Sequence, residues 1–330
     1  MSNKFDFREW WSSYTRKNTY VLSLVIFIIT TATYLALQSN AFEEGVLTRL
    51  LTSNFRTWLP VTMLAIGQTF VMLGGGLDLS SGALVSLSNV ILAIAITSNE
   101  DPLFNLMVVL GVIVLGLVAG YFNGLLTAYL GLQPMITTFA TSFVYSGLAL
   151  LILPNPWGQI PREYTNAYRN TTWFGIPLAL FIIVIVLFIW TIIKNRKYGR
   201  FLFAVGGKPD AAYYTGVRVT RIRISTYMIS GFFASLAAIS YTLLTGSGSA
   251  RSGEEMTLTA ITAAILGGTS MAGGSGSMIG SVLGVIILGT IKNLISLSKM
   301  DSWYRVLVNA VVIIVALASP GIINLFRRRK

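Results

Sequence analysis

The residue types that carry out most enzymatic chemistry are missing from this sequence or badly placed in it. The chain of 330 residues contains no histidine and no cysteine. Zinc sites, thiol nucleophiles and histidine bases are therefore excluded. Gly206-Gly207-Lys208 resembles the end of a phosphate-binding loop, but it lacks the upstream glycine and is followed by Pro209. We expect no catalytic residue, no metal and no cofactor, so the chain is not expected to be an enzyme.

Asp78 is the one acidic residue that lies close to membrane depth. It follows the glycines at 74–76 and precedes Leu79-Ser80-Ser81-Gly82. A carboxylate in such a place is costly unless it has a partner or faces a cavity. It could cap the helix that follows by accepting from the amide of Ser80 or Ser81, or it could gate a solute path. The cap is favoured, and the two roles are compatible.

Uncharged polar residues inside the apolar stretches are candidates for a solute path. Taken singly, such a residue more often forms a hydrogen bond between helices than it binds a ligand. As a set they predict a weakly polar conduit for a neutral, hydroxyl-rich solute, because a proton- or sodium-coupled carrier usually needs carboxylates within the membrane. Lys292 also lies in an apolar stretch. The candidates for the path or its gate are Gln68, Asp78, Ser80, Asn89, Asn123, Thr137, Thr141 and Asn293.

Two runs of glycine recur every four residues. One is Gly116, Gly120 and Gly124, and the other is Gly276, Gly280 and Gly284. Such stripes allow helix backbones to approach closely in a membrane. We interpret both as helix-packing faces.

The elements that must hold these residues are membrane-spanning helices. Hydrophobic residues make up 54% of the chain and charged residues only 11%, with a mean hydropathy of +0.71. A soluble domain carries about 25% charged residues, so a polytopic all-α membrane protein is predicted. The third and eighth of its ten predicted spans are short and flank Gly-rich breaks. The spans are 19–38, 57–76, 81–97, 106–128, 135–153, 174–193, 224–245, 256–268, 276–298 and 303–320.

The basic residues indicate the orientation of these spans. The chain has 24 Lys and Arg against 12 Asp and Glu, a net charge of +12. Sixteen of the basic residues fall before the first span, in the loop 194–223, or after the tenth span, all on one face. The positive-inside rule makes this face cytoplasmic and disfavours nucleic acid as the reason for the charge. The expected parts are a cytoplasmic arm 1–18, a transmembrane domain 19–326 and a basic tail 327–330.

The cytoplasmic loop 194–223 is predicted to contain a short helix at about 209–215. Pro209 and Asp210 suit the first turn, and Gly216 suits the C-terminal stop. The residues alone leave two interpretations equally open. The helix either docks a soluble subunit or is an amphipathic connector at the lipid headgroups.

Three ordered sequence blocks resemble the sugar-type ABC importer permeases, a branched-chain/ribose family that includes ribose, xylose, galactofuranose and autoinducer-2 permeases. The blocks are GQTFVMLGGGLDLSSG at 67–82, YGR…AxGG…DAAxxxGV at 198–217 and AILGGTSMAGGSG at 264–276. The resemblance covers about 55–320. The chain departs from the usual family residues at Lys208, Thr259 and Lys292, which leaves the solute open and suits a chain working beside a non-identical subunit.

The resemblance implies a multi-pass subunit of the bacterial plasma (inner) membrane that moves a monosaccharide or related solute. Its implied partners are two ABC ATPase subunits, a second permease subunit, identical or paralogous, and an extracytoplasmic solute-binding protein. The implied ATPase-coupling residues are Tyr198, Gly199, Arg200, Ala204, Gly206, Gly207, Asp210, Ala211, Ala212 and Gly216.

The sequence leaves one alternative of a different class, a stand-alone secondary transporter or channel for a small neutral solute. A membrane-embedded enzyme is disfavoured, because the chain has no His, no Cys and no pair of carboxylates within a span.

Overall fold

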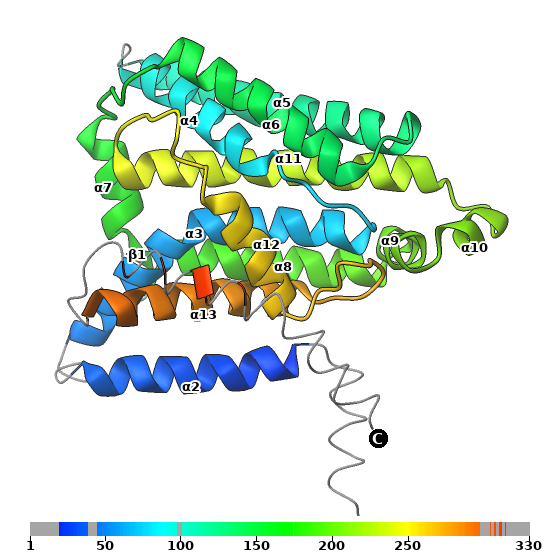
Figure 1. Cartoon of the computed structure of the whole chain (residues 1–330). Coiled ribbons are helices and arrows are strands. Elements are labelled where there is room, and N and C mark those ends of the chain that lie inside the picture. Colours follow the sequence, from blue (N-terminus) through cyan, green and yellow to red (C-terminus); the bar gives the residue numbers. More distant parts are fainter. Residues whose placement is uncertain are drawn as a thin grey trace, which may run out of the picture.

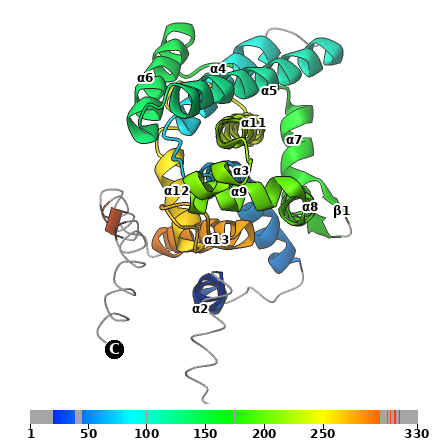
Figure 2. The same ribbon diagram turned by 90° about the vertical axis from the view of Figure 1, so that its right-hand side faces the viewer.

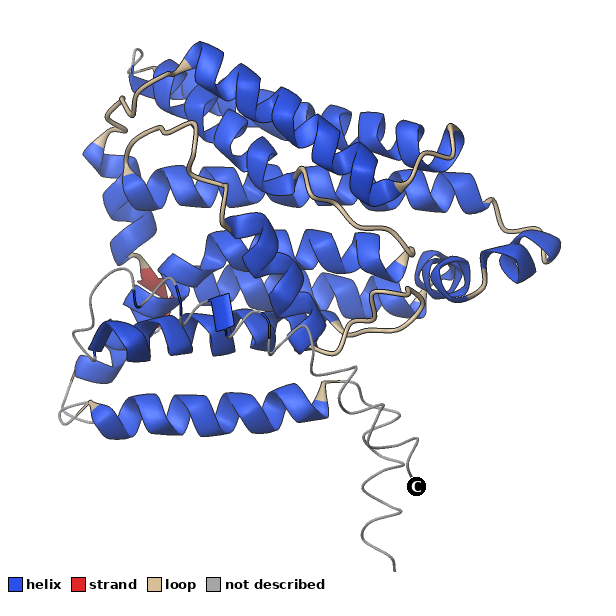
Figure 3. Ribbon diagram, viewed as in Figure 1, coloured by secondary structure: helices blue, strands red, loops and turns tan. Residues whose placement is uncertain are grey.

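The computed structural model describes residues 20–38, 45–97, 101–173 and 175–297, together with the isolated positions 304, 307, 310, 311 and 314. The described part is built from helices, with one pair of two-residue strands (Figures 1 and 3). The elements are α2 (Val21–Leu37), α3 (Val46–Leu73), α4 (Ser81–Thr97), α5 (Pro102–Gly124), the π-helical turn η1 (Leu125–Tyr129), α6 (Pro134–Ile152), α7 (Arg162–Asn170), β1 (Thr172–Trp173), β2 (Ile176–Pro177), α8 (Leu178–Asn195), α9 (Lys197–Gly207), α10 (Pro209–Tyr214), α11 (Val219–Thr245), α12 (Met256–Leu266) and α13 (Met278–Leu297).

A helix lies at each of the first nine predicted spans. Among the described residues, five stretches are long and apolar enough to cross a membrane: α5 with η1, α6, α8, α11 and α13. The third and eighth spans are the short helices α4 and α12, and α12 has only 11 residues. At 1.5 Å per residue α12 covers about 16 Å, roughly half of the hydrocarbon core. The tenth predicted span, the arm 1–18 and the tail 327–330 lie outside the described residues, apart from five isolated helical positions.

Helices α3 and α11 form the centre of the molecule. Figure 2 shows α4, α5 and α6 on one side of this pair and α12, α13 and α2 on the other, with α8 beside α3. Small residues permit this packing. A Cβ added at Gly116 of α5 would overlap the carbonyl of Gly231 on α11, and one added at Gly231 would overlap the carbonyl of Gly116. The two backbones are therefore in direct contact.

The two predicted glycine stripes differ in extent. Gly120 and Gly124 follow Gly116 against α11, so all three members face one helix. Gly280 and Gly284 of α13 face Gly267 and Ala263, at the end of α12. Gly276 does not belong to a helical stripe, because α13 begins at Met278 and Gly276 faces Thr269 within the break.

The end of the molecule opposite α9 and α10 contains elements that the hydropathy pattern did not predict. The short helix α7 follows α6, and the hairpin of β1 and β2 leads into α8, which starts at Leu178 rather than at 174. The loop after α6 also pairs with the loop after α11. The Trp157 amide donates to the Gly248 carbonyl at 3.1 Å, and the Gly248 amide donates to the Trp157 carbonyl at 2.9 Å.

The outer helices carry large apolar side chains on their free faces. Leu110 of α5, Phe143 of α6 and Phe188 of α8 are 52%, 63% and 65% exposed. A soluble protein rarely exposes apolar patches of this extent, whereas acyl chains of a bilayer cover them without cost.

Candidate translocation and coupling sites

Asp78 lies at the centre of a buried hydrogen-bonded cluster between α3 and α4. The residue is 2% exposed. Its Oδ1 accepts from the Ser80 amide at 2.9 Å and from Ser80 Oγ at 2.7 Å. Its Oδ2 accepts from Ser230 Oγ of α11 at 2.7 Å. The carboxylate thus holds the amide that the sequence predicts for a cap and also joins the break to the central helix.

Neighbouring polar side chains hold the backbone around Asp78. With its amide oriented to suit, Gln68 of α3 donates to the Asp78 carbonyl at 3.1 Å and accepts from the Asp78 amide at 3.2 Å. Asn123 of α5 donates to Ser80 Oγ at 2.8 Å. Thr138 of α6 accepts from the Leu79 amide at 3.0 Å. Four of the candidates, Gln68, Asp78, Ser80 and Asn123, are therefore brought together, and we call these four with Ser230 and Thr138 the Asp78 cluster.

The Asp78 cluster is closed in this conformation. The adjacent space, lined by Gly74, Thr127 and Tyr227 among others, measures about 20 Å³. Such a volume accommodates about one water molecule and no sugar. Asp78 and Ser80 bond to partners on α5 and α11, whereas Asn123 Oδ1 is buried without a hydrogen-bond partner among the described residues. The cluster thus bridges the break between α3 and α4 in this state.

Asn89 of α4 holds a second polar cluster near the other end of the molecule. Its Nδ2 donates to Thr242 Oγ1 at 2.8 Å and to the Ser247 carbonyl at 3.2 Å. Its Oδ1 accepts from the Ser249 amide at 2.8 Å and from Ser252 Oγ at 3.1 Å. Each of the two polar atoms of this side chain thus makes two hydrogen bonds, and together these bonds fix the loop between α11 and α12 to α4.

The remaining candidates lie apart from both clusters. The hydroxyls of Thr137 and Thr141 donate to carbonyls of their own helix, at Gln133 and Thr138 respectively. Asn293 of α13 donates to Asn54 Oδ1 of α3 at 3.1 Å. It lines a polar cavity of about 550 Å³ together with Trp58, Thr259, Lys292, Glu254 and Glu255. We call this space the polar cavity.

Helices α9 and α10 project from one end of the molecule (Figure 1). The predicted helix at 209–215 is present as α10, with Pro209 in its first turn, and Gly216 follows it with φ of +83°. Arg200, Ala204, Gly207, Asp210, Ala211 and Gly216 are exposed. Gly199, Gly206 and Ala212 are buried, and Ala212 packs with Val205 and Val217.

Aromatic side chains add to the exposed surface of α10. Tyr213 and Tyr214 are 69% and 85% exposed, with ring centroids 6.0 Å apart. Tyr198 of α9 is turned inward instead, where its hydroxyl pairs with Ser225 Oγ at 2.8 Å. Burial raises the pKa of this phenol, so it stays neutral at physiological pH. Tyr213 and Tyr214 are not among the predicted coupling residues, although two adjacent tyrosines in a short polar helix were a usable signal.

Three Gly-rich segments meet at the base of α9. A Cβ on Gly206 would overlap the Leu73 carbonyl, and the Gly274 amide donates to that same carbonyl at 3.1 Å. A Cβ on Gly273 would lie 2.6 Å from the Gly206 carbonyl oxygen and 2.8 Å from the Gly75 Cα. We call Gly75, Gly206, Gly273 and Gly274 the glycine junction. It joins the end of α9 to the break after α3 and to the break before α13.

The fold and these sites define a class of protein. In this polytopic helical chain, two Gly-rich breaks interrupt the helices, polar side chains form small hydrogen-bonded clusters, and an exposed helix pair touches both breaks. These are features of a membrane permease, in which broken helices lie at the solute path.

Comparison with known proteins identifies the family. Residues 50–317 match the family described as "Branched-chain amino acid transport system / permease component". The chain belongs to this family of ABC transporter permeases, whose members are non-catalytic, multi-pass membrane subunits of bacterial importers.

Several curated relatives match over most of their length. The chain is 36% identical to the ribose import permease protein RbsC of Bacillus subtilis (strain 168) over 257 residues, which cover 77% of this chain and 79% of the relative. It is 29% identical to the D-allose transport system permease protein AlsC of Escherichia coli (strain K12), over 97% and 95% of the two chains. It is 31% identical to the autoinducer 2 import system permease protein LsrC of Photorhabdus luminescens, over 78% of each. No solved structure matches the chain.

Proposed function

We propose that this permease moves a monosaccharide or a similarly hydroxyl-rich solute inward across the bacterial plasma membrane. The relatives are named for import of ribose, D-allose and autoinducer 2, all of them small and rich in hydroxyl groups. Within the Asp78 cluster the polar side chains are uncharged except for Asp78 itself, which suits a neutral solute. In the proposed topology ten spans cross the membrane, and both termini and the 194–223 loop are cytoplasmic.

The polar cavity is the proposed access chamber for the solute. Its volume of about 550 Å³ lies within the usual range for small-molecule pockets, and Trp58 supplies an aromatic wall. Thr259 and Lys292 both line it. These are two of the three positions at which the chain departs from the usual family residues, so this cavity is the proposed place where the particular solute is selected.

ATPase subunits are the proposed partners of α9 and α10. One observation carries this assignment: the exposed α10 directly follows α9, and Gly206 near the end of α9 lies against both the end of α3 and the break before α13. A displacement of α10 by a bound ATPase would therefore reach both broken helices through backbone contacts. A second permease subunit and an extracytoplasmic binding protein would complete the importer.

The docking assignment is tested by placing a charge on α10. Ala211→Glu changes an exposed position in the proposed interface, and Asn166→Glu makes the same kind of change on exposed α7 at the other end. In proteoliposomes containing the assembled importer, we expect Ala211→Glu to abolish ATP-driven uptake while Asn166→Glu transports normally. Normal uptake by Ala211→Glu would defeat the docking assignment.

The same system separates the importer from a stand-alone carrier. Uptake should require both the ATPase subunits and ATP. Solute accumulation by the permease alone, driven by its own gradient or by an ion gradient, would replace the proposed function with a secondary transporter or channel.

A further inference from the structure

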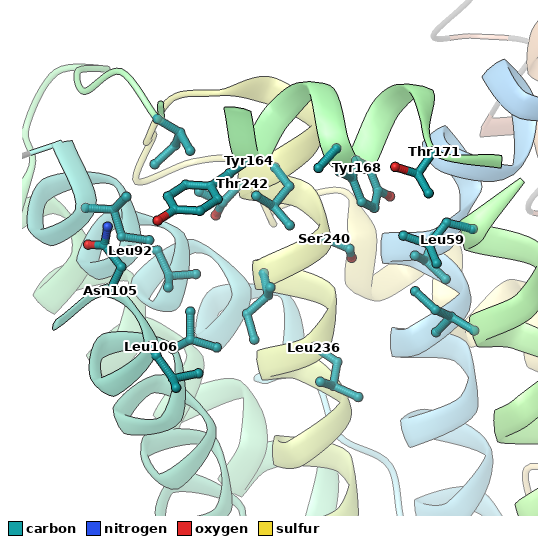
Figure 4. Close-up of a pocket in the computed structure, with 18 of the residues that line it drawn as sticks. Leu59, Leu92, Asn105, Leu106, Tyr164, Tyr168, Thr171, Leu236, Ser240 and Thr242 are labelled. Carbon is teal, nitrogen blue, oxygen red and sulfur yellow. The ribbon is translucent and has the colours of Figure 1, made fainter. Parts of the chain in front are cut away.

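A large apolar cavity lies at the end of the molecule that carries α7. It measures about 600 Å³ and is bounded by α3, α4, α5, α8 and α11, with α7 across its end (Figure 4). Leu59, Leu92, Leu106 and Leu236 supply its walls from four different helices. None of the candidate path residues lines this space, and it is separate from the polar cavity.

Helix α7 closes the cavity with its apolar face. Tyr164, Ala167, Tyr168 and Thr171 line the cavity, at the spacing of one helix face. The opposite face presents Arg162, Glu163, Asn166 and Asn170, all of them exposed. An amphipathic helix of this kind lies at the boundary between headgroups and acyl chains. It is held in place on α3, since Tyr168 donates to the Arg56 carbonyl at 2.7 Å.

The cavity is unsuited to a hydroxyl-rich solute. Ser240 and Thr242 line it, but their hydroxyls already donate to the carbonyls of Ala237 and Ala238 at 3.0 and 2.8 Å. The other walls are chiefly hydrocarbon. Moving a sugar hydroxyl from water to such a surface without a replacement hydrogen bond is unfavourable. The occupant must therefore be apolar itself.

The mouth of the cavity continues into the lipid-facing surface. Leu106 lines the cavity and is 54% exposed, so it lies at the rim. On the outer faces of the two flanking helices, Leu110 of α5 and Val184 of α8 are 52% and 54% exposed. Figure 2 shows α5 and α8 apart on this side of the molecule, with α7 running between their levels. In a membrane permease this opening faces acyl chains.

We propose that the cavity holds one acyl chain of a membrane phospholipid, whose headgroup lies beside the polar face of α7. The chain fills space next to α11 that side chains leave open, and filled space restores the dispersion contacts that an empty cavity loses. The site is in the outer leaflet in the orientation proposed above. The lipid then acts as a wedge between α5 and α8, and its presence should stabilise the subunit.

A photoreactive lipid tests this proposal. The assembled importer is placed in nanodiscs containing phosphatidylethanolamine with a diazirine in the middle of one acyl chain, irradiated, and mapped by peptide mass spectrometry. We expect cross-links on α11 near Leu236 and Ile239 as well as on the outer faces of α5 and α8. Ile239→Trp should fill the cavity, remove the α11 cross-links and leave the surface cross-links in place.

The matched control is Leu110→Trp, which adds the same side chain on the exposed face of α5 outside the cavity. It should keep the α11 cross-links. If Ile239→Trp does not assemble, Ala167→Leu narrows the cavity from α7 and should give the same loss. Cross-links confined to the outer faces in the parent protein would overturn the proposal. The proposal would also be overturned if the second permease subunit covered the mouth of the cavity and blocked the cross-links. That result would identify this face as a subunit interface. Neither result bears on ATP-driven uptake, so the proposed function is tested separately.

Discussion

At the scale of single residues, one carboxylate organises the broken segment between α3 and α4. Asp78 accepts three hydrogen bonds, and its own backbone is held by Gln68. A buried acidic group is tolerated when its oxygens are fully bonded, and removing the acceptor leaves its donors unsatisfied. These bonds support the structural role of Asp78. They are compatible with the proposed gating role, in which the cluster would rearrange when the path opens.

We expect Asp78→Ala to destabilise the permease strongly. The amide and hydroxyl of Ser80 and the hydroxyl of Ser230 would lose their acceptor, at about 1–3 kcal/mol for each group left unsatisfied in the interior. Ser230→Ala is the matched comparison, because it removes one donor and leaves the Ser80 bonds in place. Its expected cost is about 1 kcal/mol. Thermal unfolding of the two purified variants measures the difference, and equal midpoints would contradict the central role of Asp78.

The sequence predicted part of this cluster. The local partner Ser80 follows from the capping rule, since it lies two residues after Asp78. Ser230 is 152 positions away on a helix rich in small residues, and nothing in its surroundings distinguishes it from Ser235 or Ser240. Thr137 and Thr141 show the reverse case. They were sensible candidates by type, yet their hydroxyls donate only to the backbone carbonyls of Gln133 and Thr138 and bond to no side chain of either cluster.

At the scale of elements, the glycine junction connects parts of the chain that the sequence treats separately. The two Gly-rich breaks were predicted, and Gly206 was named as a coupling residue, but the predicted helix at 209–215 is α10, and α9 was not predicted as a helix. The contact between these segments was not predicted either, because backbone-to-backbone approach leaves no side-chain pattern. The wide spacing of these segments in the sequence also gives no indication that they meet. The junction explains why glycine is required at Gly206, where any side chain would overlap the end of α3.

Adjacent glycines of α9 allow a matched test. A Cβ at Gly206 would overlap the Leu73 carbonyl, whereas at Gly207 it would lie 3.8 Å from the Gly274 Cα, an ordinary contact. We expect Gly206→Ala to cost about 1–3 kcal/mol, as for an overpacked core. Gly207→Ala should be neutral or stabilising, since alanine favours helix by up to about 1 kcal/mol. Unfolding midpoints of the two variants provide the comparison, and a tolerated Gly206→Ala would show that the junction is loosely packed.

Helix α7 shows what the hydropathy pattern misses. A search for stretches of about 20 apolar residues passes over nine residues that include Arg162, Glu163 and Arg169. The spacing of Tyr164, Ala167, Tyr168 and Thr171 was the signal available, because a short interfacial helix is recognised by its amphipathic face. The longer spans were found reliably since apolar length alone specifies them.

At the scale of the whole molecule, the largest group of basic residues lies at one end of the helix bundle. Figure 1 shows α9 and α10 at one end, where the 194–223 loop carries eight basic residues, and α7 at the other. The order of helices around α3 and α11 was not predictable from the sequence, because each span is apolar on several faces and the pairing depends on shape. The proposed orientation follows from charge alone and can be tested without reference to transport.

The absence of cysteine makes this test direct. The parent chain has no thiol, so a single introduced cysteine is the only site for a maleimide on this subunit. Asn166→Cys on α7 and Tyr214→Cys on α10 change exposed positions at opposite ends. With a membrane-impermeant maleimide on intact cells, we expect labelling of Asn166→Cys, and labelling of Tyr214→Cys only after permeabilisation. The parent chain serves as the unlabelled control. Labelling of Tyr214→Cys from outside would show that the topology is the reverse of the proposed one. The proposed ATPase contact of α10 and the proposed entry of solute through the polar cavity would then both be wrong.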